Sequence, residues 1–215
     1  MINGITLKIC GITSVDDAIA AAGIGADYLG FIFHPESPRQ VSEARFRRMA
    51  AQLPPTRKVA VLVEADPARL ERLLPFGFDA YQLHFRADAE TTALTAWQQT
   101  VGRERLWLAP QLAPDAELHP EWLALADTFL CDTFHPGKFG GTGRTGNWPQ
   151  FRRQAEAHPE KTWILAGGLT PDNLNAAIEA TDALFVDVNS GVESAPGIKD
   201  PEKLFALWRA LERLG

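Results

Sequence analysis

The sequence predicts a β/α barrel, in which eight parallel strands alternate with helices and close into a cylinder. Short apolar runs alternate with longer segments of helical period, which is typical of strands buried on both faces. Eight such runs are present, and none has the character of an edge strand. The length of 215 residues lies near the lower limit of ~200 residues for this fold. An open, doubly wound parallel sheet is the alternative.

The apolar runs define the expected strands. We place these strands at residues 5–10, 27–33, 57–63, 79–84, 105–112, 127–132, 161–166 and 183–188. Capping residues and prolines at favoured first positions mark the helix starts between them. We expect helices to begin at Ser14, Ser42, Pro67, Asp88, Pro171 and Pro201. The stretch 113–126 is harder to assign, because two prolines interrupt its period.

Composition places the chain among ordinary globular proteins, and we expect residues 1–215 to form one domain. Hydrophobic residues make up 46% of the chain and charged residues 22%. The formal net charge of -6 argues against non-specific binding to nucleic acid or to acidic membranes. A local nest of N–H groups can still bind one small anion in an acidic protein.

Two well-separated cysteines, with no zinc-ligand spacing around them, predict neither a disulfide framework nor a metal site. They fit a reducing, cytoplasmic setting. The N-terminus shows no signal peptide, and no apolar run reaches the ~20 residues of a membrane helix.

The chemistry of a β/α barrel lies at the C-terminal ends of its strands. Cys10 ends the first strand, where a thiol can serve as a base or simply pack as a small apolar group. Asp132 ends the sixth strand and can donate a proton or cap the loop. Its neighbour Cys131 should face the opposite way and pack structurally. His135 and Lys138 follow in a glycine-rich loop that could cover a substrate.

Glycine-containing turns follow the seventh and eighth strands. Gly167 and Gly168 end one strand, and Ser190 and Gly191 follow the other. Turns at these two places commonly bind phosphate in barrels, because they present backbone N–H groups to an anion. The sequence therefore predicts a phosphate site between them.

Several charged and polar residues fall at strand ends or inside strands. Arg39 lies in a proline-rich loop after the second strand, where it is either a carboxylate clamp or a solvated surface residue. Alternation puts Gln82 and His84 on one face, and we interpret His84 as a neutral hydrogen-bonding wall residue. Lys8 and Asp187 lie within apolar strands. Because buried charges need partners, we expect these two to form an ion pair.

The residues also resemble a known family. The segment LKICGITSVDDAIAAAGIGADYLGFIFHPESPRQVS is similar to the start of phosphoribosylanthranilate isomerases. AVLV, AYQLH, CDT followed by GGTGRTGNW, ILAGGLTPDNL and VDVNSGVESAPGIKD then follow in family order. The resemblance is weakest over residues 86–126.

This resemblance implies a function and roles for the candidate residues. The family consists of β/α barrels without cofactor or metal, which rearrange N-(5-phosphoribosyl)anthranilate, a phosphorylated small molecule, in tryptophan biosynthesis. Cys10 would be the general base and Asp132 the general acid, and Arg39 would grip the anthranilate carboxylate. The turns at 167–168 and 190–191 would bind phosphate. Members of the family are monomers or homodimers.

Three departures from the family pattern and two alternatives remain. Phe85 replaces a usual glycine after QLH, Asn189 replaces a usual serine, and the fifth strand lacks a frequent lysine.

The histidine-pathway Amadori isomerase is one alternative function, but it uses paired aspartates on the first and fifth strands. The other alternative is a non-catalytic barrel that binds a sugar phosphate or a partner protein.

Overall fold

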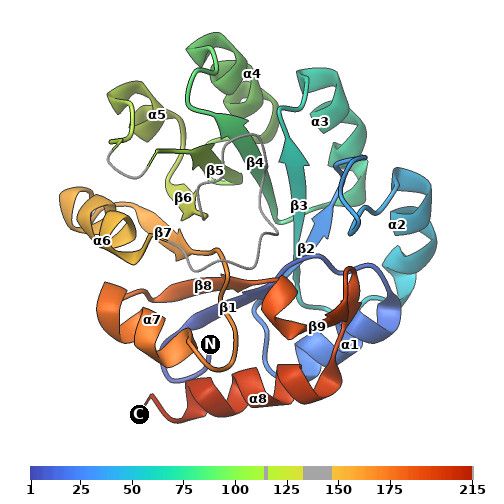
Figure 1. Ribbon diagram of the computed structural model, residues 1–215. Coiled ribbons are helices and arrows are strands. Elements are labelled where there is room, and N and C mark those ends of the chain that lie inside the picture. The colour runs from blue at the N-terminus through green and yellow to red at the C-terminus, as the bar shows by residue number, and fades with distance from the viewer. Residues whose placement is uncertain (114–115, 133–146, 215) are drawn as a thin grey trace.

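The computed structural model describes residues 1–113, 116–132 and 147–214, and its centre is a closed barrel of parallel strands (Figure 1). Each strand pairs with the next along the chain, and β8 pairs with β1 to close the cylinder. The strands are β1 (Thr6–Ile9), β2 (Tyr28–Ile32), β3 (Arg57–Val63), β4 (Ala80–Arg86), β5 (Leu106–Gln111), β6 (Thr128–Cys131), β7 (Thr162–Leu165) and β8 (Phe185–Val188). The predicted barrel is therefore confirmed, and the open sheet is excluded.

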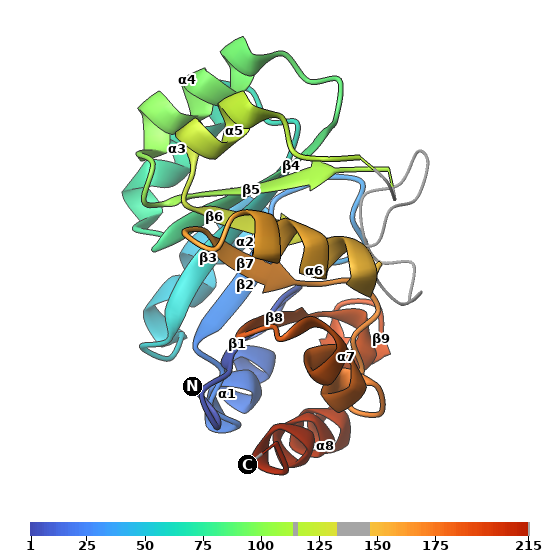
Figure 2. The same cartoon turned by 90° about the vertical axis from the view of Figure 1, so that its left-hand side faces the viewer.

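Helices surround the strands on the outside of the barrel (Figures 1 and 2). The α-helices are α1 (Val15–Gly23), α2 (Glu43–Met49), α3 (Pro67–Leu73), α4 (Thr91–Val101), α5 (Pro120–Leu125), α6 (Trp148–Ala157), α7 (Leu174–Thr181) and α8 (Pro201–Glu212). Short 3-10 helices follow α2, α3 and β8 at Ala50–Gln52, Leu74–Phe76 and Ser190–Val192. Within the described residues, no helix is long and apolar enough to cross a membrane.

Local capping explains where several helices begin. The hydroxyl groups of Ser14 and Ser42 accept hydrogen bonds from the backbone N–H groups three residues on, at the starts of α1 and α2. Pro201 occupies the first turn of α8, after the capping residue Asp200. These starts agree with the sequence prediction.

Two predicted helix starts are wrong by a few residues. Helix α4 begins after Glu90 rather than at Asp88, and α7 begins after Asn173 rather than at Pro171. Before α7, the Asn173 amide oxygen accepts from Thr170 N–H, so residues 170–173 form a turn that delays the helix.

The core has two parts, because alternate strand residues face opposite sides. Outward-facing residues pack against the helices in a continuous apolar shell. Inward-facing residues form a smaller cluster within the barrel, which includes Cys10, Val61, Trp107 and Leu130. Phe85 belongs to the outer shell, where its ring contacts those of Trp97 and Trp122. Phe85 therefore lies within β4 and packs outward, away from the barrel interior.

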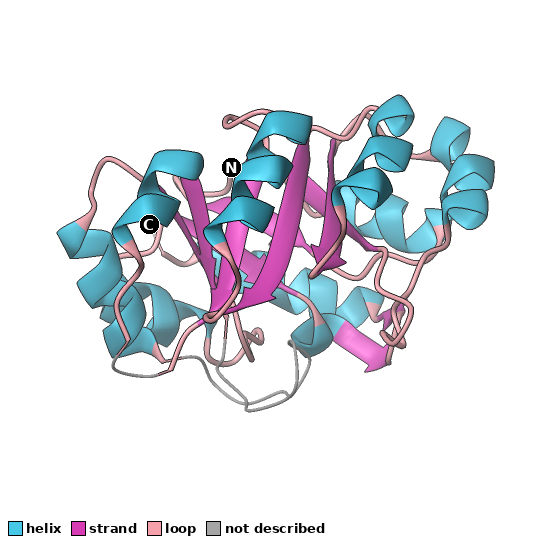
Figure 3. Cartoon of the chain, turned by 90° about the horizontal axis from the view of Figure 1, so that it is seen from above, coloured by secondary structure: helices cyan, strands magenta, loops and turns pink. Residues whose placement is uncertain are grey.

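A small antiparallel pair, β9 (Glu193–Ala195) and β10 (Ile198–Lys199), was not predicted from the sequence. It lies apart from the barrel strands (Figure 3), on the side toward which the strands point (Figure 2). This pair therefore stands beside the end of the barrel where the candidate residues lie.

Candidate active site

Cys10 lies just past the end of β1, inside the barrel. Its backbone N–H donates to Val188 O at 2.9 Å, and the residue is 4% exposed. Two residues earlier on the same face, Lys8 is fully buried and its Nζ lies 2.8 Å from Asp187 Oδ2. The predicted ion pair is therefore confirmed, and it lies directly beneath the thiol.

The surroundings of Cys10 act on its charge in opposite directions. Burial raises the pKa of the Cys10 thiol above its ordinary value, whereas the positive charge of Lys8 lowers it. Asp187 raises this pKa and Lys199 lowers it. Burial also lowers the pKa of Lys8, but Asp187 and Cys10 outweigh that effect, so the pKa is raised. Burial and Asp187 therefore outweigh the two lysines at the Cys10 thiol, so its pKa is raised, and the raised pKa of Lys8 keeps a cation beside it.

Asp132 follows β6, which is three strands from β1 around the barrel. Leu130 faces the interior, and Cys131 packs against the outer shell. Strand alternation therefore turns Asp132, which is half-buried, toward the interior side. Burial, and then the charge of Asp132, raises the pKa of Cys131 to about 12. The structural role predicted for Cys131 is thus confirmed; His135 and Lys138 lie outside the described residues.

His84 and Gln82 share the inner face of β4, as predicted. Gln82 Nε2 and His84 Nε2 lie 2.7 Å apart. Burial lowers the pKa of His84 to about 3, and the charges of Lys8 and His34 add to this effect. His84 is therefore neutral at physiological pH, which suits hydrogen bonding rather than proton transfer.

The turns after β7 and β8 lie against each other. Gly167 and Gly168 have positive φ values of 88° and 63°. Gly191 passes so close to the backbone of Leu169 that a Cβ at residue 191 would overlap the Leu169 carbonyl oxygen. Asn173 Nδ2 donates to Gly168 O at 2.9 Å and holds the first turn in place. The two glycine turns are thus brought together, as the sequence predicted.

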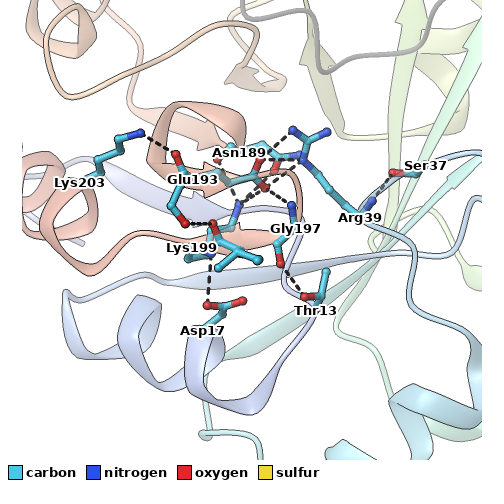
Figure 4. A network of polar contacts seen from close by, with 11 residues as sticks. Thr13, Asp17, Ser37, Arg39, Asn189, Glu193, Gly197, Lys199 and Lys203 are labelled. Carbon is cyan, nitrogen blue, oxygen red and sulfur yellow. Dashed lines mark hydrogen bonds and ion pairs between the residues drawn. The ribbon is translucent and has the colours of Figure 1, made fainter.

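Arg39 is not a solvated surface residue. Only 8% of it is exposed, and its guanidinium forms a salt bridge with Glu193 of β9 (Figure 4). Lys199 of β10 lies 3.0 Å from the same carboxylate and 3.1 Å from Asn189 Oδ1. Sequence reasoning missed Glu193 and Lys199, although both belong to the quoted segment VDVNSGVESAPGIKD.

Ionisable groups and two glycine turns thus gather at the C-terminal ends of the strands, which is where enzymes of the β/α-barrel class carry their active sites. Residues 7–210 match the family model of N-(5'-phosphoribosyl)anthranilate isomerase. The chain therefore belongs to that family.

Individual relatives agree with the family match along the whole chain. The N-(5'-phosphoribosyl)anthranilate isomerase of Neisseria meningitidis is 35% identical over 211 residues, which cover 98% of each chain. The crystal structure of phosphoribosyl anthranilate isomerase from Thermus thermophilus superimposes with a TM-score of 0.82 at 30% identity, covering 98% of this chain and 100% of that one. A further phosphoribosyl anthranilate isomerase, at 26% identity and a TM-score of 0.73, covers 98% of this chain and 100% of its own; it is in complex with reduced 1-(o-carboxyphenylamino)-1-deoxyribulose 5-phosphate.

Proposed function

We propose that the protein catalyses the Amadori rearrangement of N-(5-phosphoribosyl)anthranilate to 1-(2-carboxyphenylamino)-1-deoxyribulose 5-phosphate, a step of tryptophan biosynthesis. The family match over residues 7–210 is the observation that carries this proposal. The ligand of the related structure is a reduced form of the same product, which supports a carboxylated, phosphorylated substrate. We place the reaction in the cytoplasm, a setting in which two unpaired cysteines stay reduced.

The reaction requires one acid and one base. Opening the ribose ring needs a proton on the ring oxygen, and we assign its delivery to Asp132. The resulting iminium loses the proton on C2, and we assign its removal to the Cys10 thiolate. This loss gives an enolamine, which tautomerises to the ketone product by gaining a proton on C1 and losing the proton of its C2 hydroxyl. Positioned groups of this kind each contribute ~10²–10⁴-fold to the rate. To act as this base, the Cys10 thiol first releases its own proton to solvent, and the nearby cations Lys8 and Lys199 favour that release.

Both ends of the substrate carry negative charge, and the site offers a separate place for each. The turns at 167–168 and 190–191 provide backbone N–H groups for the phosphate. Arg39 provides a guanidinium for the anthranilate carboxylate. Neutral His84 completes the wall as a hydrogen-bonding group for the substrate. Fixing both ends holds the sugar between Cys10 and Asp132, which lowers the entropic cost of reaction.

The histidine-pathway isomerase is disfavoured by the inner face of β5. The sequence of β5, LWLAPQ, contains no acidic residue. Trp107 and Ala109 occupy its interior positions. The second aspartate that the alternative requires is therefore missing.

Fluorescence measurements with freshly prepared phosphoribosylanthranilate test the proposal. The native protein should remove the anthranilate-type fluorescence rapidly, and Cys10→Ala should reduce this rate by at least ~10²-fold, because it removes the base. Cys131→Ala is the matched control, because this thiol packs outside the barrel; it should keep a rate within about threefold of the native one. Loss no faster than the spontaneous background with native protein would overturn the proposal.

A further inference from the structure

The carboxylate of Glu193 holds Arg39 along one edge of the guanidinium. Arg39 Nε donates to Oε1 at 2.9 Å and to Oε2 at 3.1 Å, and Nη2 donates to Oε2 at 2.7 Å. Arg39 lies in the loop after β2 and Glu193 begins β9, 154 positions away. Both are more than nine-tenths buried. Figure 4 shows them facing each other at the centre of a polar network.

A guanidinium has two edges that can each bind a carboxylate in a fork of N–H groups. Every hydrogen bond that the described residues make to the Arg39 guanidinium uses Nε or Nη2. With the Nε–Nη2 edge on Glu193, the edge formed by Nη1 and the second hydrogen of Nη2 remains for another carboxylate. Glu193 thereby selects which edge is presented.

The local charge favours an additional anion. Lys199 Nζ lies 3.0 Å from Glu193 Oε1, so two cations share one carboxylate. Burial raises the pKa of Glu193, but the hydrogen bonds and charges of Arg39 and Lys199 outweigh burial and lower it. Glu193 is therefore ionised at neutral pH. Burial lowers the pKa of Lys199, although Glu193 opposes that effect. The three side chains carry one excess positive charge while Lys199 is protonated.

Glu193 is held independently of Arg39. Its backbone carbonyl accepts from Lys203 Nζ of α8 at 2.6 Å, and Gly197 N–H donates to Oε1 at 3.2 Å. The Gly197 carbonyl in turn accepts from Thr13 Oγ1 at 2.6 Å. These hydrogen bonds connect Glu193 to α8 and to the start of α1. They hold its carboxylate in place, so that it can restrain the long, flexible side chain of Arg39.

We propose that Glu193, supported by Lys199, is a positioning residue that holds the guanidinium of Arg39 ready for the substrate carboxylate. This inference rests on the proposed function. Without Glu193, Arg39 is free to adopt several rotamers, and the substrate must order it on binding. The cost appears in KM, because the bound substrate, once it has ordered Arg39, makes the same contacts as in the native protein.

The alternative role of the network is to fasten the loop after β8, which also carries Ser190 and Gly191. In that case the loss of Glu193 would weaken phosphate binding as much as carboxylate binding. A test must therefore separate the two ends of the substrate.

Steady-state kinetics of Glu193→Gln, Arg39→Ala and the double variant separate these roles. We expect Glu193→Gln to raise KM about tenfold, the ordering cost of one side chain, with kcat within about threefold of native. In the Arg39→Ala background the same substitution should change KM by less than about twofold, because its effect acts through Arg39. The inhibition constant of inorganic phosphate should stay within about twofold of native. Glu156→Gln, which breaks an exposed glutamate–arginine pair on α6, is the matched control.

Each contrary result has a distinct meaning. A parallel rise in the phosphate inhibition constant, or an undiminished effect in the Arg39→Ala background, would show that Glu193 only supports the loop. A native KM in Glu193→Gln would refute the inference while native turnover upholds the proposed function. Absence of turnover in the native protein would overturn both. If Glu193→Gln does not fold, Glu193→Asp is the second variant, because it keeps the negative charge but moves the carboxylate away from Arg39. It should likewise raise KM and leave kcat close to native.

Discussion

His84 shows how a single side chain inside the barrel responds to its burial. The imidazole shares the interior with Lys8, and its pKa is lowered from 6.5 to about 3. Between about pH 3 and pH 6.5, the unfolded chain therefore carries a proton on His84 that the folded chain lacks. The free energy of unfolding attributable to His84 is fully present above pH 6.5 and is lost as the pH falls toward 3.

A substitution at this position measures that linkage. Between pH 6.5 and pH 4, the unfolding free energy of the native protein should fall by about 2 kcal/mol more than that of His84→Asn, after allowance for partial exposure. Urea unfolding at several pH values provides the measurement, and His119→Asn, at an exposed position, controls for loss of an imidazole. Parallel curves for native protein and His84→Asn would mean that the folded protein protonates His84 readily.

Individual residues also show where prediction from sequence ends. The pairing of Lys8 with Asp187 was predictable, because two charges inside apolar strands require partners. The pairing of Arg39 with Glu193 was not, because Arg39 lies in a loop and Glu193 in the short strand β9, and the paths of both segments depend on the closed barrel. No periodicity relates two such residues 154 positions apart.

Among the elements, the turn after β8 depends most strictly on one residue type, because position 191 has room only for glycine. A Cβ at Gly191 would overlap Leu169 O, and it would also lie 2.9 Å from the Leu169 carbonyl carbon. Backbone atoms cannot swing aside as side chains can, so Gly191→Ala must push the two glycine turns apart. We expect KM and the inhibition constant of phosphate to rise at least tenfold, roughly the loss of one or two charge-assisted hydrogen bonds.

Gly23→Ala is the matched control for this experiment, because a Cβ there meets nothing within 4 Å and the residue ends helix α1. Titration with inorganic phosphate, followed by calorimetry, reports the anion site without requiring turnover. Unchanged phosphate affinity in Gly191→Ala would remove the β8 turn from the phosphate site.

The elements themselves were largely predictable, since their signals are local. All eight barrel strands lie within two residues of their expected bounds. Helix starts set by a serine or aspartate cap agree, whereas α4 and α7 begin late, because the chain turns first. The β9–β10 pair has only five strand residues, too few to show an alternating pattern.

At the scale of the whole molecule, the Lys8–Asp187 pair joins the first and last strands of the cylinder. Lys8→Met should cost about 3–5 kcal/mol of unfolding free energy, because it leaves Asp187 charged and buried. Combining it with Asp187→Leu should cost less than the sum of the two single changes. Urea unfolding of the four proteins measures this coupling.

The exposed pair of Arg152 and Glu156 on α6 is the reference for that cycle, and its coupling should not exceed about 0.5 kcal/mol. Strictly additive effects of the Lys8 and Asp187 substitutions would show that the two charges do not depend on each other. The sequence predicted this pair, but the depth at which it lies follows only from closure of the barrel.

The same pair has a consequence for biosynthesis on the ribosome. Lys8 is translated 179 residues before its partner, which corresponds to roughly 10–35 s at ~5–20 residues per second. Throughout that interval Lys8 lacks the carboxylate that compensates for burial of its charge, and the growing sheet keeps an unpaired edge at β1. Nascent chains that stall before β8 emerges would therefore present an open strand edge to chaperones or to one another. Completion of the cylinder thus waits for the last strand to leave the exit tunnel.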